Sequence, residues 1–155
     1  KDIRMSRSIW TYVVLGVPVV GLAVLLLSPS TAPVVDPMAV PDTSNLEVGE
    51  AIADVIIPAS FSQNAQIGQI AFEGACSACH GLNAAGKKGF APPLVHVTYR
   101  PGHHGDEAFW RATQNGVQSH HWDFGNMPQI EGLTRSDVSY IVAYVRELQQ
   151  ANGIN

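Results

Sequence analysis

The sequence predicts a small helical domain of about 95 residues, from 61 to 155, behind an apolar N-terminal segment and a proline-rich linker. Three stretches show helical spacing of apolar residues or helix end signals, at about 64–75, 106–115 and 134–152. The chain between the first two, residues 81–105, is rich in glycine and proline and has no strand signal of useful length. So much irregular chain in so small a domain indicates that something other than secondary structure organises it.

The apolar segment, residues 9–27, has nineteen residues without a charge and would be about 28 Å long as a helix. The hydrocarbon core of a bilayer is about 30 Å thick, so we expect residues 1–27 to form a transmembrane anchor in the lipid bilayer. Lys1, Arg4 and Arg7 precede the segment, whereas the first charges after it are acidic. The positive-inside rule then leaves the N-terminus in the cytoplasm and the rest of the chain outside it.

A cleaved signal peptide is the alternative for this segment. It too would have a basic start, an apolar stretch and small residues such as Ser30, Thr31 and Ala32. The apolar stretch is longer than the hydrophobic region of a usual signal peptide, which favours a retained anchor.

Residues 28–60 form the predicted linker, outside the cytoplasm. The linker has no sustained helical or strand period, and its prolines are Pro29, Pro33, Pro37, Pro41 and Pro58. A flexible linker of this length would let a tethered domain sweep the nearby membrane surface. Its apolar piece, residues 52–57, is instead suited to contact with a partner, because exposed apolar runs usually mark contacts.

The first helical pattern, about 64–75, places four apolar residues on one side and leads directly into the cysteines. These residues are Ile67, Ile70, Ala71 and Phe72. The second pattern, about 106–115, begins with Asp106 and Glu107, which suit the positive end of a helix dipole, and stops at Gly116.

The third helical pattern is the clearest. Thr134 and Asp137 form a capping-box pattern at its start, and Asn152 with Gly153 end it. The apolar residues that recur at helical spacing are Val138, Ile141, Val142, Val145 and Leu148.

The charge balance excludes one class of partner. The chain has nine Lys and Arg residues and a net charge of −4. A sequence-independent nucleic-acid binder needs a basic face to neutralise phosphates, so we expect no nucleic acid among the partners.

Cys76 and Cys79, the only cysteines, lie one helical turn apart and are followed at once by His80. A thioredoxin-like redox pair would need a βαβ setting, and the strands are missing. A structural zinc site would need four ligands, usually from two knuckles, and only one knuckle exists. In the third interpretation both thiols bond to the vinyl groups of haem and the histidine coordinates the iron. The sequence therefore predicts one covalently attached haem c with His80 as an axial ligand.

An electron carrier also needs a second axial ligand on the iron. Met5 and Met38 lie in the anchor region and the linker, which leaves Met127 as the candidate. Ligation by histidine and methionine raises the reduction potential relative to two histidines. His120 or His121, which lie close to Met127 in the sequence, are the alternative ligands.

These motifs resemble, in their order, a class I c-type cytochrome. They are Gly68, Phe72, Cys76, Cys79 and His80, then Pro92, Pro93 and Leu94, then Asn126, Met127 and Pro128, then the helical run SYIVAYVREL. The resemblance covers about residues 62–150, and the anchor and linker resemble those of membrane-tethered bacterial members.

The resemblance implies an all-α cytochrome c fold wrapped around a covalently bound haem, in the domain of residues 61–155. It implies that the first and last helices cross near Gly68 and the face of Tyr140 and Tyr144. It also implies that the Pro92 carbonyl accepts the Nδ1 hydrogen of His80. The haem-binding residues would be Cys76, Cys79, His80, Met127, Pro92 and Leu94, with His80 and Met127 on the iron.

The implied function is electron transfer without catalysis, in a bacterial inner membrane, with the haem domain in the periplasm. The expected partners are membrane redox complexes: a quinol:cytochrome c oxidoreductase (bc1-type complex) as donor, and a terminal oxidase or a photosynthetic reaction centre as acceptor. Two alternatives stay open. One is a permanent haem subunit through which electrons enter a larger oxidoreductase. The other is a copper-handling protein.

The copper alternative depends on two histidine pairs in a stretch where the sequence departs from the family. His103 and His104 precede the second helix, and His120 and His121 follow it. They would bind copper or zinc if the helix brought the pairs together, since imidazole suits both metals. Histidine pairs in loops are more often solvated or packed near a partner surface.

Overall fold

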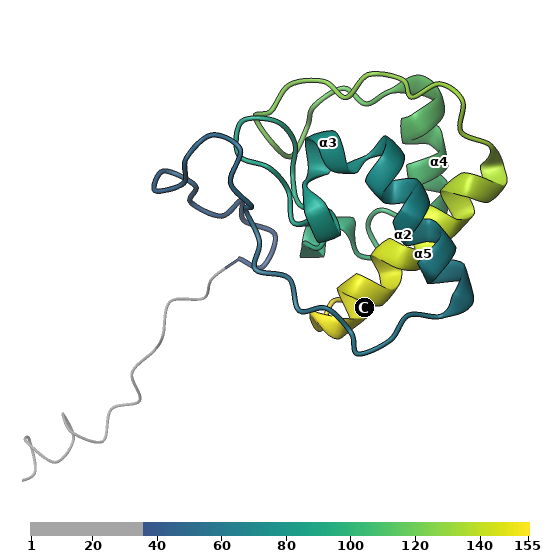
Figure 1. The fold of residues 1–155 in the computed structure, drawn as a ribbon. Helices are drawn as coiled ribbons and strands as arrows, with labels where there is room; N and C mark the ends of the chain where they lie inside the picture. The colour runs from purple at the N-terminus through teal and green to yellow at the C-terminus, as the bar shows by residue number, and fades with distance from the viewer. Residues whose placement is uncertain (1–35) are drawn as a thin grey trace, which may run out of the picture. The chain divides into compact units, whose positions relative to one another are not determined.

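The computed structural model describes residues 36–155, which form one compact unit from Asp36 to Asn155 (Figure 1). The predicted membrane anchor and the first part of the linker lie outside the described residues. Within residues 36–155, no helix is both long and apolar enough to cross a bilayer.

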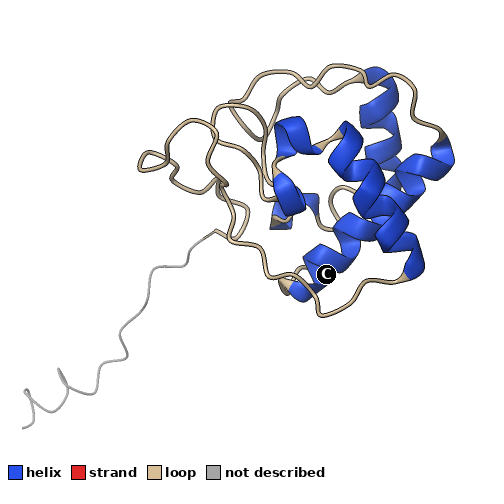
Figure 2. Cartoon of the chain, viewed as in Figure 1, coloured by secondary structure: helices blue, strands red, loops and turns tan. Residues whose placement is uncertain are grey.

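The described part of the chain is helical. Its elements are α2 (Gln63–Ala75), α3 (Ser77–His80), the 3-10 helices η1 (Leu82–Ala84) and η2 (Val97–Tyr99), α4 (Asp106–Asn115) and α5 (Arg135–Ala151). Figure 2 shows helices joined by long loops, and the only β-pairing among these residues is two isolated bridges. The prediction of a helical domain is therefore confirmed.

The ends of the three long helices follow from local chemistry and agree with the prediction to within two residues. The Ser62 side chain accepts a hydrogen bond from the Ala65 N–H at the start of α2. Thr134 and Asp137 form the predicted capping box at the start of α5, which satisfies two backbone donors that have no partner within the helix. Gly116 ends α4 in a left-handed conformation, which costs glycine little.

The first and last of these helices, α2 and α5, cross each other (Figure 1). Gly68 lies at the crossing, against the backbone of Tyr140. A Cβ atom on residue 68 would overlap the carbonyl oxygen of Tyr140, so only glycine allows this approach. Beyond the crossing Phe72 packs on Tyr144, with ring centroids 5.6 Å apart, and Leu148, one turn further along α5, is fully buried. The expected crossing near Gly68 and the Tyr140 and Tyr144 face is confirmed.

The buried face of α2 differs from the side that the apolar pattern indicates. Ile67 is 42% exposed and Ile70 is 74% exposed, whereas Ala65, Gly68 and Phe72 are buried. The close crossing explains this, since the face that meets α5 must carry the small residues. Phe72 is buried, as expected, whereas the two isoleucines are exposed, and the expectation for them is wrong.

Residues 36–60, which the sequence analysis assigns to the linker, contact the helical part through backbone hydrogen bonds. The Gly49 N–H donates to the Lys88 carbonyl (2.9 Å), and the Lys88 N–H donates to the Glu50 carbonyl (2.8 Å). Further along, Ile56 exchanges two hydrogen bonds of 2.9 Å with the side chain of Asn152. This segment is therefore held against its own domain. The domain boundary at residue 60 stays a prediction.

The apolar piece at residues 52–57 is divided between two environments. Val55 packs against the core of the domain, whereas Ile56 and Ile57 are 65% and 44% exposed. Val55 thus contacts its own domain, and the predicted contact of this piece with a partner stays a prediction.

A buried polar network holds the irregular chain before α4 onto α5. Gln149 is fully buried, and its side-chain amide donates to the carbonyls of Leu94 (2.8 Å) and Tyr99 (3.0 Å). The guanidinium of Arg146 donates to the Gln149 side-chain oxygen (2.7 Å) and to the Tyr99 carbonyl (2.6 Å). These bonds satisfy carbonyl groups of a segment whose only regular structure is the short 3-10 helix η2.

Candidate functional site

The two cysteines and the adjacent histidine lie at the junction of α2 and α3. The Cys76 N–H still donates to Phe72 (2.8 Å), which makes Cys76 the cap of α2, and its carbonyl accepts from the N–H groups of Cys79 (3.2 Å) and His80 (2.9 Å). One helical turn therefore fixes both cysteines relative to His80.

The two thiols have different environments, and the structure contains no disulfide between them. Cys76 is half-buried and Cys79 is exposed. Burial, and secondly the neighbouring Cys79, raise the pKa of Cys76 to about 11. A thioredoxin-like redox pair needs a lowered thiol pKa, so this environment argues against that alternative. Cys76 and Cys79 are also absent from the one cluster of potential metal ligands in residues 36–155.

His80 is held in a single orientation by the expected hydrogen bond. Its Nδ1 donates to the Pro92 carbonyl at 2.9 Å, which leaves Nε2 as the nitrogen with a free lone pair. Burial lowers the pKa of His80, and the bond to Pro92 opposes this shift to a smaller extent. The ring is therefore neutral at neutral pH, which is the form that binds a metal ion.

The loop that carries Pro92 is built by tight turns. Gly86 has a positive φ of 74°, and a Cβ atom there would overlap the backbone nitrogen of Pro93. Leu94 is buried in the hydrophobic core, and its N–H donates to the Ala84 carbonyl at 2.9 Å. The predicted contact of Leu94 with the cofactor stays a prediction.

Met127 lies in the loop between α4 and α5, on a different segment from His80. Its backbone pairs with Val117 in an isolated bridge, with two hydrogen bonds of 2.9 Å. A Cβ atom on Gly116 would lie 2.5 Å from the Met127 carbonyl oxygen, so the two sides of the loop are closely packed there. The side chain is half-buried, and its role as an iron ligand stays a prediction.

Trp122 provides a test of whether these residues fit a haem. The residue is 6% exposed, and its indole N–H is the only buried side-chain polar atom of the described residues that makes no hydrogen bond of good geometry, although its interaction with the Tyr99 hydroxyl partly opposes the rise that burial causes in the pKa of Tyr99. A buried donor of this kind usually has an acceptor in the complete molecule, and a carboxylate of haem is a chemically suitable one. The neutral His80 imidazole, the protonated Cys76 thiol and this unpaired donor together fit the group.

The structure also brings the predicted histidine pairs together. The ring nitrogens of His103, His104 and His121 that could bind a metal all lie within 4.8 Å of one another. His120 lies beside them, with its ring centroid 4.4 Å from that of His121.

Two features of the site have no clear signal in the sequence. Gln149 and Arg146 fall within an amphipathic helix, where polar residues usually face solvent. The burial of the Trp122 N–H cannot be predicted from the sequence either, since the sequence shows only an aromatic residue near Met127. Both depend on contacts between distant segments.

Comparison with known proteins gives one match. The model of the family described as Cytochrome c matches residues 65–149, which is more than half of the 155 residues. No curated protein and no solved structure matches the chain. A match to this family means that the chain carries covalently bound haem c, and Cys76 and Cys79 have the required spacing.

Proposed function

Because the chain belongs to the cytochrome c family and is an electron-transfer haem protein, we propose that it is a membrane-tethered one-electron carrier. It would move electrons between the periplasmic faces of membrane redox complexes, from a bc1-type complex to a terminal oxidase or a photosynthetic reaction centre. The charge-free segment 9–27 and the basic residues before it support the tether. Tethering would keep the carrier at a high local concentration near its partners.

His80 and Met127 are the proposed axial ligands. When bound, haem c supplies a one-electron couple whose potential depends on these two ligands. His80 offers a neutral ring that its bond to the Pro92 carbonyl holds in place. The half-buried thioether of Met127 lies in a loop that the bridge to Val117 holds in place.

The alternative ligands, His120 and His121, are engaged elsewhere in the structure. His121 Nε2 lies 3.1 Å from His103 Nε2, and His120 Nδ1 donates to the Gln118 carbonyl at 2.9 Å. These contacts favour Met127.

The single observation that carries the carrier function is the hydrogen bond from His80 Nδ1 to the Pro92 carbonyl, next to two free cysteines. Such a bond holds an iron-binding imidazole and tunes the metal through the ring. Redox titration of the purified chain in detergent tests the function directly. We expect one reversible one-electron transition, and a reduced form that does not bind carbon monoxide because both axial positions are occupied. Rapid carbon monoxide binding would contradict the proposal.

Membrane extraction tests the tether separately. After washing with alkaline carbonate, the full chain should stay in the membrane fraction, and a chain without residues 1–27 should be released with its haem. Release of the full chain by the wash would contradict the tether. A mature protein found without the N-terminal segment would support the signal-peptide alternative.

A permanent haem subunit of a larger oxidoreductase is the second candidate. The hydrogen bonds between residues 49–56 and the domain favour it, because they remove part of the predicted linker from the free tether. Co-purification from gently solubilised membranes separates the candidates. A fixed subunit would appear in constant ratio with the other subunits, whereas a mobile carrier would separate from its partners at high salt.

A further inference from the structure

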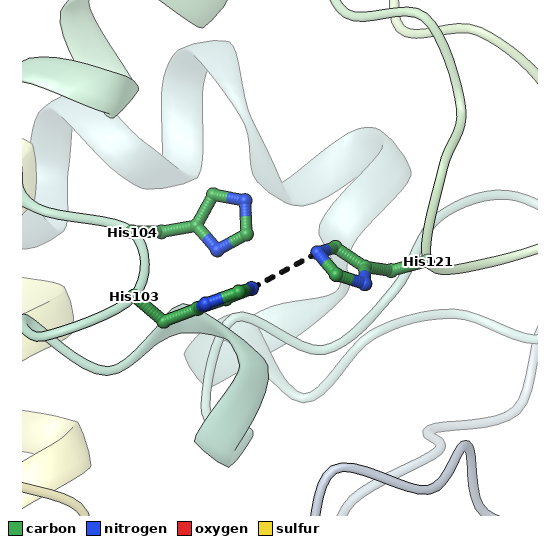
Figure 3. A group of neighbouring side chains, drawn as sticks. All are labelled: His103, His104 and His121. Carbon is green, nitrogen blue, oxygen red and sulfur yellow. Dashed lines mark hydrogen bonds between the residues drawn. The ribbon is translucent and has the colours of Figure 1, made fainter.

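The cluster of His103, His104 and His121 is built from two loops on either side of α4. His103 and His104 come from the turn before the helix, and His121 comes from the loop after it (Figure 3). In Figure 3 the three rings are turned toward a common space. His103 Nε2 and His121 Nε2 are 3.1 Å apart.

This spacing is close to that of imidazoles bound to one metal ion. Two nitrogens at about 2.05 Å from a tetrahedral Zn²⁺ are about 3.3 Å apart. The ligand atoms of all three histidines lie within 4.8 Å of one another, so small side-chain rotations would bring them around one ion. Three protein ligands would leave one position for water or for the neighbouring His120.

His104 is the histidine that its surroundings orient most firmly. Its Nδ1 donates to the Thr98 carbonyl at 2.7 Å, which leaves Nε2 free to bind a metal. Its own carbonyl accepts from Arg146 of α5 at 2.7 Å, and Arg146 forms an ion pair with Asp106 at 2.9 Å. Ligand histidines characteristically have the second ring nitrogen bonded to a carbonyl or carboxylate in this way.

The donor set selects the kind of metal. The cluster contains only imidazoles, with neither a carboxylate nor a thiol among its members. Imidazole nitrogen suits copper, zinc and nickel, whereas calcium and magnesium need oxygen ligands. Among these divalent ions Cu²⁺ has the highest intrinsic affinity for nitrogen ligands.

We propose that His103, His104 and His121 bind one late first-row divalent ion, Cu²⁺ in preference to Zn²⁺, at a site separate from the haem. The proposal depends neither on the membrane tether nor on the identity of the redox partners. It requires that His121 is not the second iron ligand, and His121 Nε2 lies 3.1 Å from His103 Nε2 within the cluster.

Metal titration of the full, haem-containing chain tests the proposal. The haem is kept in the ferric state so that no electron passes to the copper. The content of haem iron gives the protein concentration. We expect one Cu²⁺ per haem iron with a dissociation constant below about 1 µM, and weaker binding of Zn²⁺. Less than one copper per iron at saturation, or tighter binding of Zn²⁺, would overturn it.

Substitutions show which residues hold the ion. The double variant H103Q and H121Q should lose more than about 100-fold in Cu²⁺ affinity, because it removes two ligands. His96 offers a matched control, since its Nδ1 pairs with the Thr98 hydroxyl at 2.9 Å and not with the cluster. His96→Gln should bind Cu²⁺ as the unchanged chain does.

Two further measurements guard against trivial explanations. The haem absorption spectrum and the iron content of each variant show whether the domain is still folded. The electron paramagnetic resonance spectrum of bound Cu²⁺ should show coupling to imidazole nitrogens that disappears in the double variant. Equal copper binding by the folded double variant and the unchanged chain would refute the site.

Discussion

Gly68 of α2 lies directly against the backbone of Tyr140 in α5. A Cβ atom on residue 68 would overlap the Tyr140 carbonyl oxygen and would come within 3.1 Å of the Ile141 nitrogen. Backbone atoms cannot rotate away as a side chain can, so a larger residue here must push the two helices apart.

We therefore expect Gly68→Ala to destabilise the domain by about 3 kcal/mol, the upper end of the usual cost of overpacking. Gly74 is the matched control, because it lies in the same helix and a Cβ atom there would meet nothing within 4 Å. Gly74→Ala should stabilise the domain by about 0.5–1 kcal/mol through its higher helix propensity. Guanidinium denaturation followed by circular dichroism measures both. Equal midpoints for the two variants would show that the helices do not meet at Gly68.

Gln149 is a second position at which one side chain supports a distant segment. Replacement by leucine would leave the Leu94 carbonyl without the donor that the side-chain amide provides at 2.8 Å. A buried polar group without a partner costs about 1–3 kcal/mol, so Gln149→Leu should lower the free energy of unfolding by that amount.

The adjacent Gln150 is exposed and serves as the control for this substitution. Gln150→Leu should change stability by no more than about 0.5 kcal/mol, as usual for a surface position. Urea denaturation of both variants gives the comparison. If Gln149→Leu were as stable as the unchanged chain, the network would contribute nothing to the attachment of this loop.

The capping box of α5 predicts a dependence on pH. Thr134→Ala should cost about 1 kcal/mol at pH 7, because the Asp137 N–H loses its acceptor. The Thr134 hydroxyl, and secondly its backbone N–H, lower the pKa of Asp137 below its ordinary value of 3.8. A lowered carboxyl pKa stabilises the fold above the ordinary value, and this contribution is lost as the pH falls through the folded-state pKa. The difference between variant and unchanged chain should therefore shrink below pH 3.8.

Denaturation series at neutral and acid pH measure this difference. Ser136→Ala, an exposed change in the same turn of helix, should give no comparable loss at either pH. A difference that stays constant down to pH 3, well below about 3.8, would mean that Asp137 takes no part in the cap.

Met127→His tests the proposed second iron ligand. Two histidines on haem iron give a lower reduction potential than histidine with methionine, so the midpoint potential should fall. The fall should be a substantial part of the range of about 0.8 V over which axial ligands set haem potentials. Spectroelectrochemical titration measures it.

Met38→Leu is the control, since the Met38 sulfur lies 2.9 Å from Arg100 Nη1 in the segment before the helices. It should leave the potential unchanged. An unchanged potential in the folded Met127→His variant would exclude Met127 as a ligand.

The helix ends could be predicted because their signals are local. Thr134 and Asp137 lie within one turn of each other, and Gly116 ends α4 through its own backbone freedom. The hydrogen bond from His80 to Pro92 came from the family resemblance, since twelve residues separate its partners.

The positions that could not be predicted depend on how distant segments meet. The apolar pattern placed Ile67 and Ile70 with Phe72, yet the approach of Tyr140 to Gly68 turns a different face of α2 inward. The histidine cluster likewise needs two loops to meet across α4. The sequence identifies the histidines of the cluster, but their spacing along the chain cannot show that they are neighbours in space.

The crossing of α2 and α5 has a consequence for the order in which the domain can form. The helix that precedes the cysteines has its main partner at the far end of the chain, so a growing polypeptide must be nearly complete before Gly68 has anything to pack against. Until then Cys76 and Cys79 belong to an open segment. A reaction at their sulfur atoms would meet the least steric obstruction before α5 packs against α2.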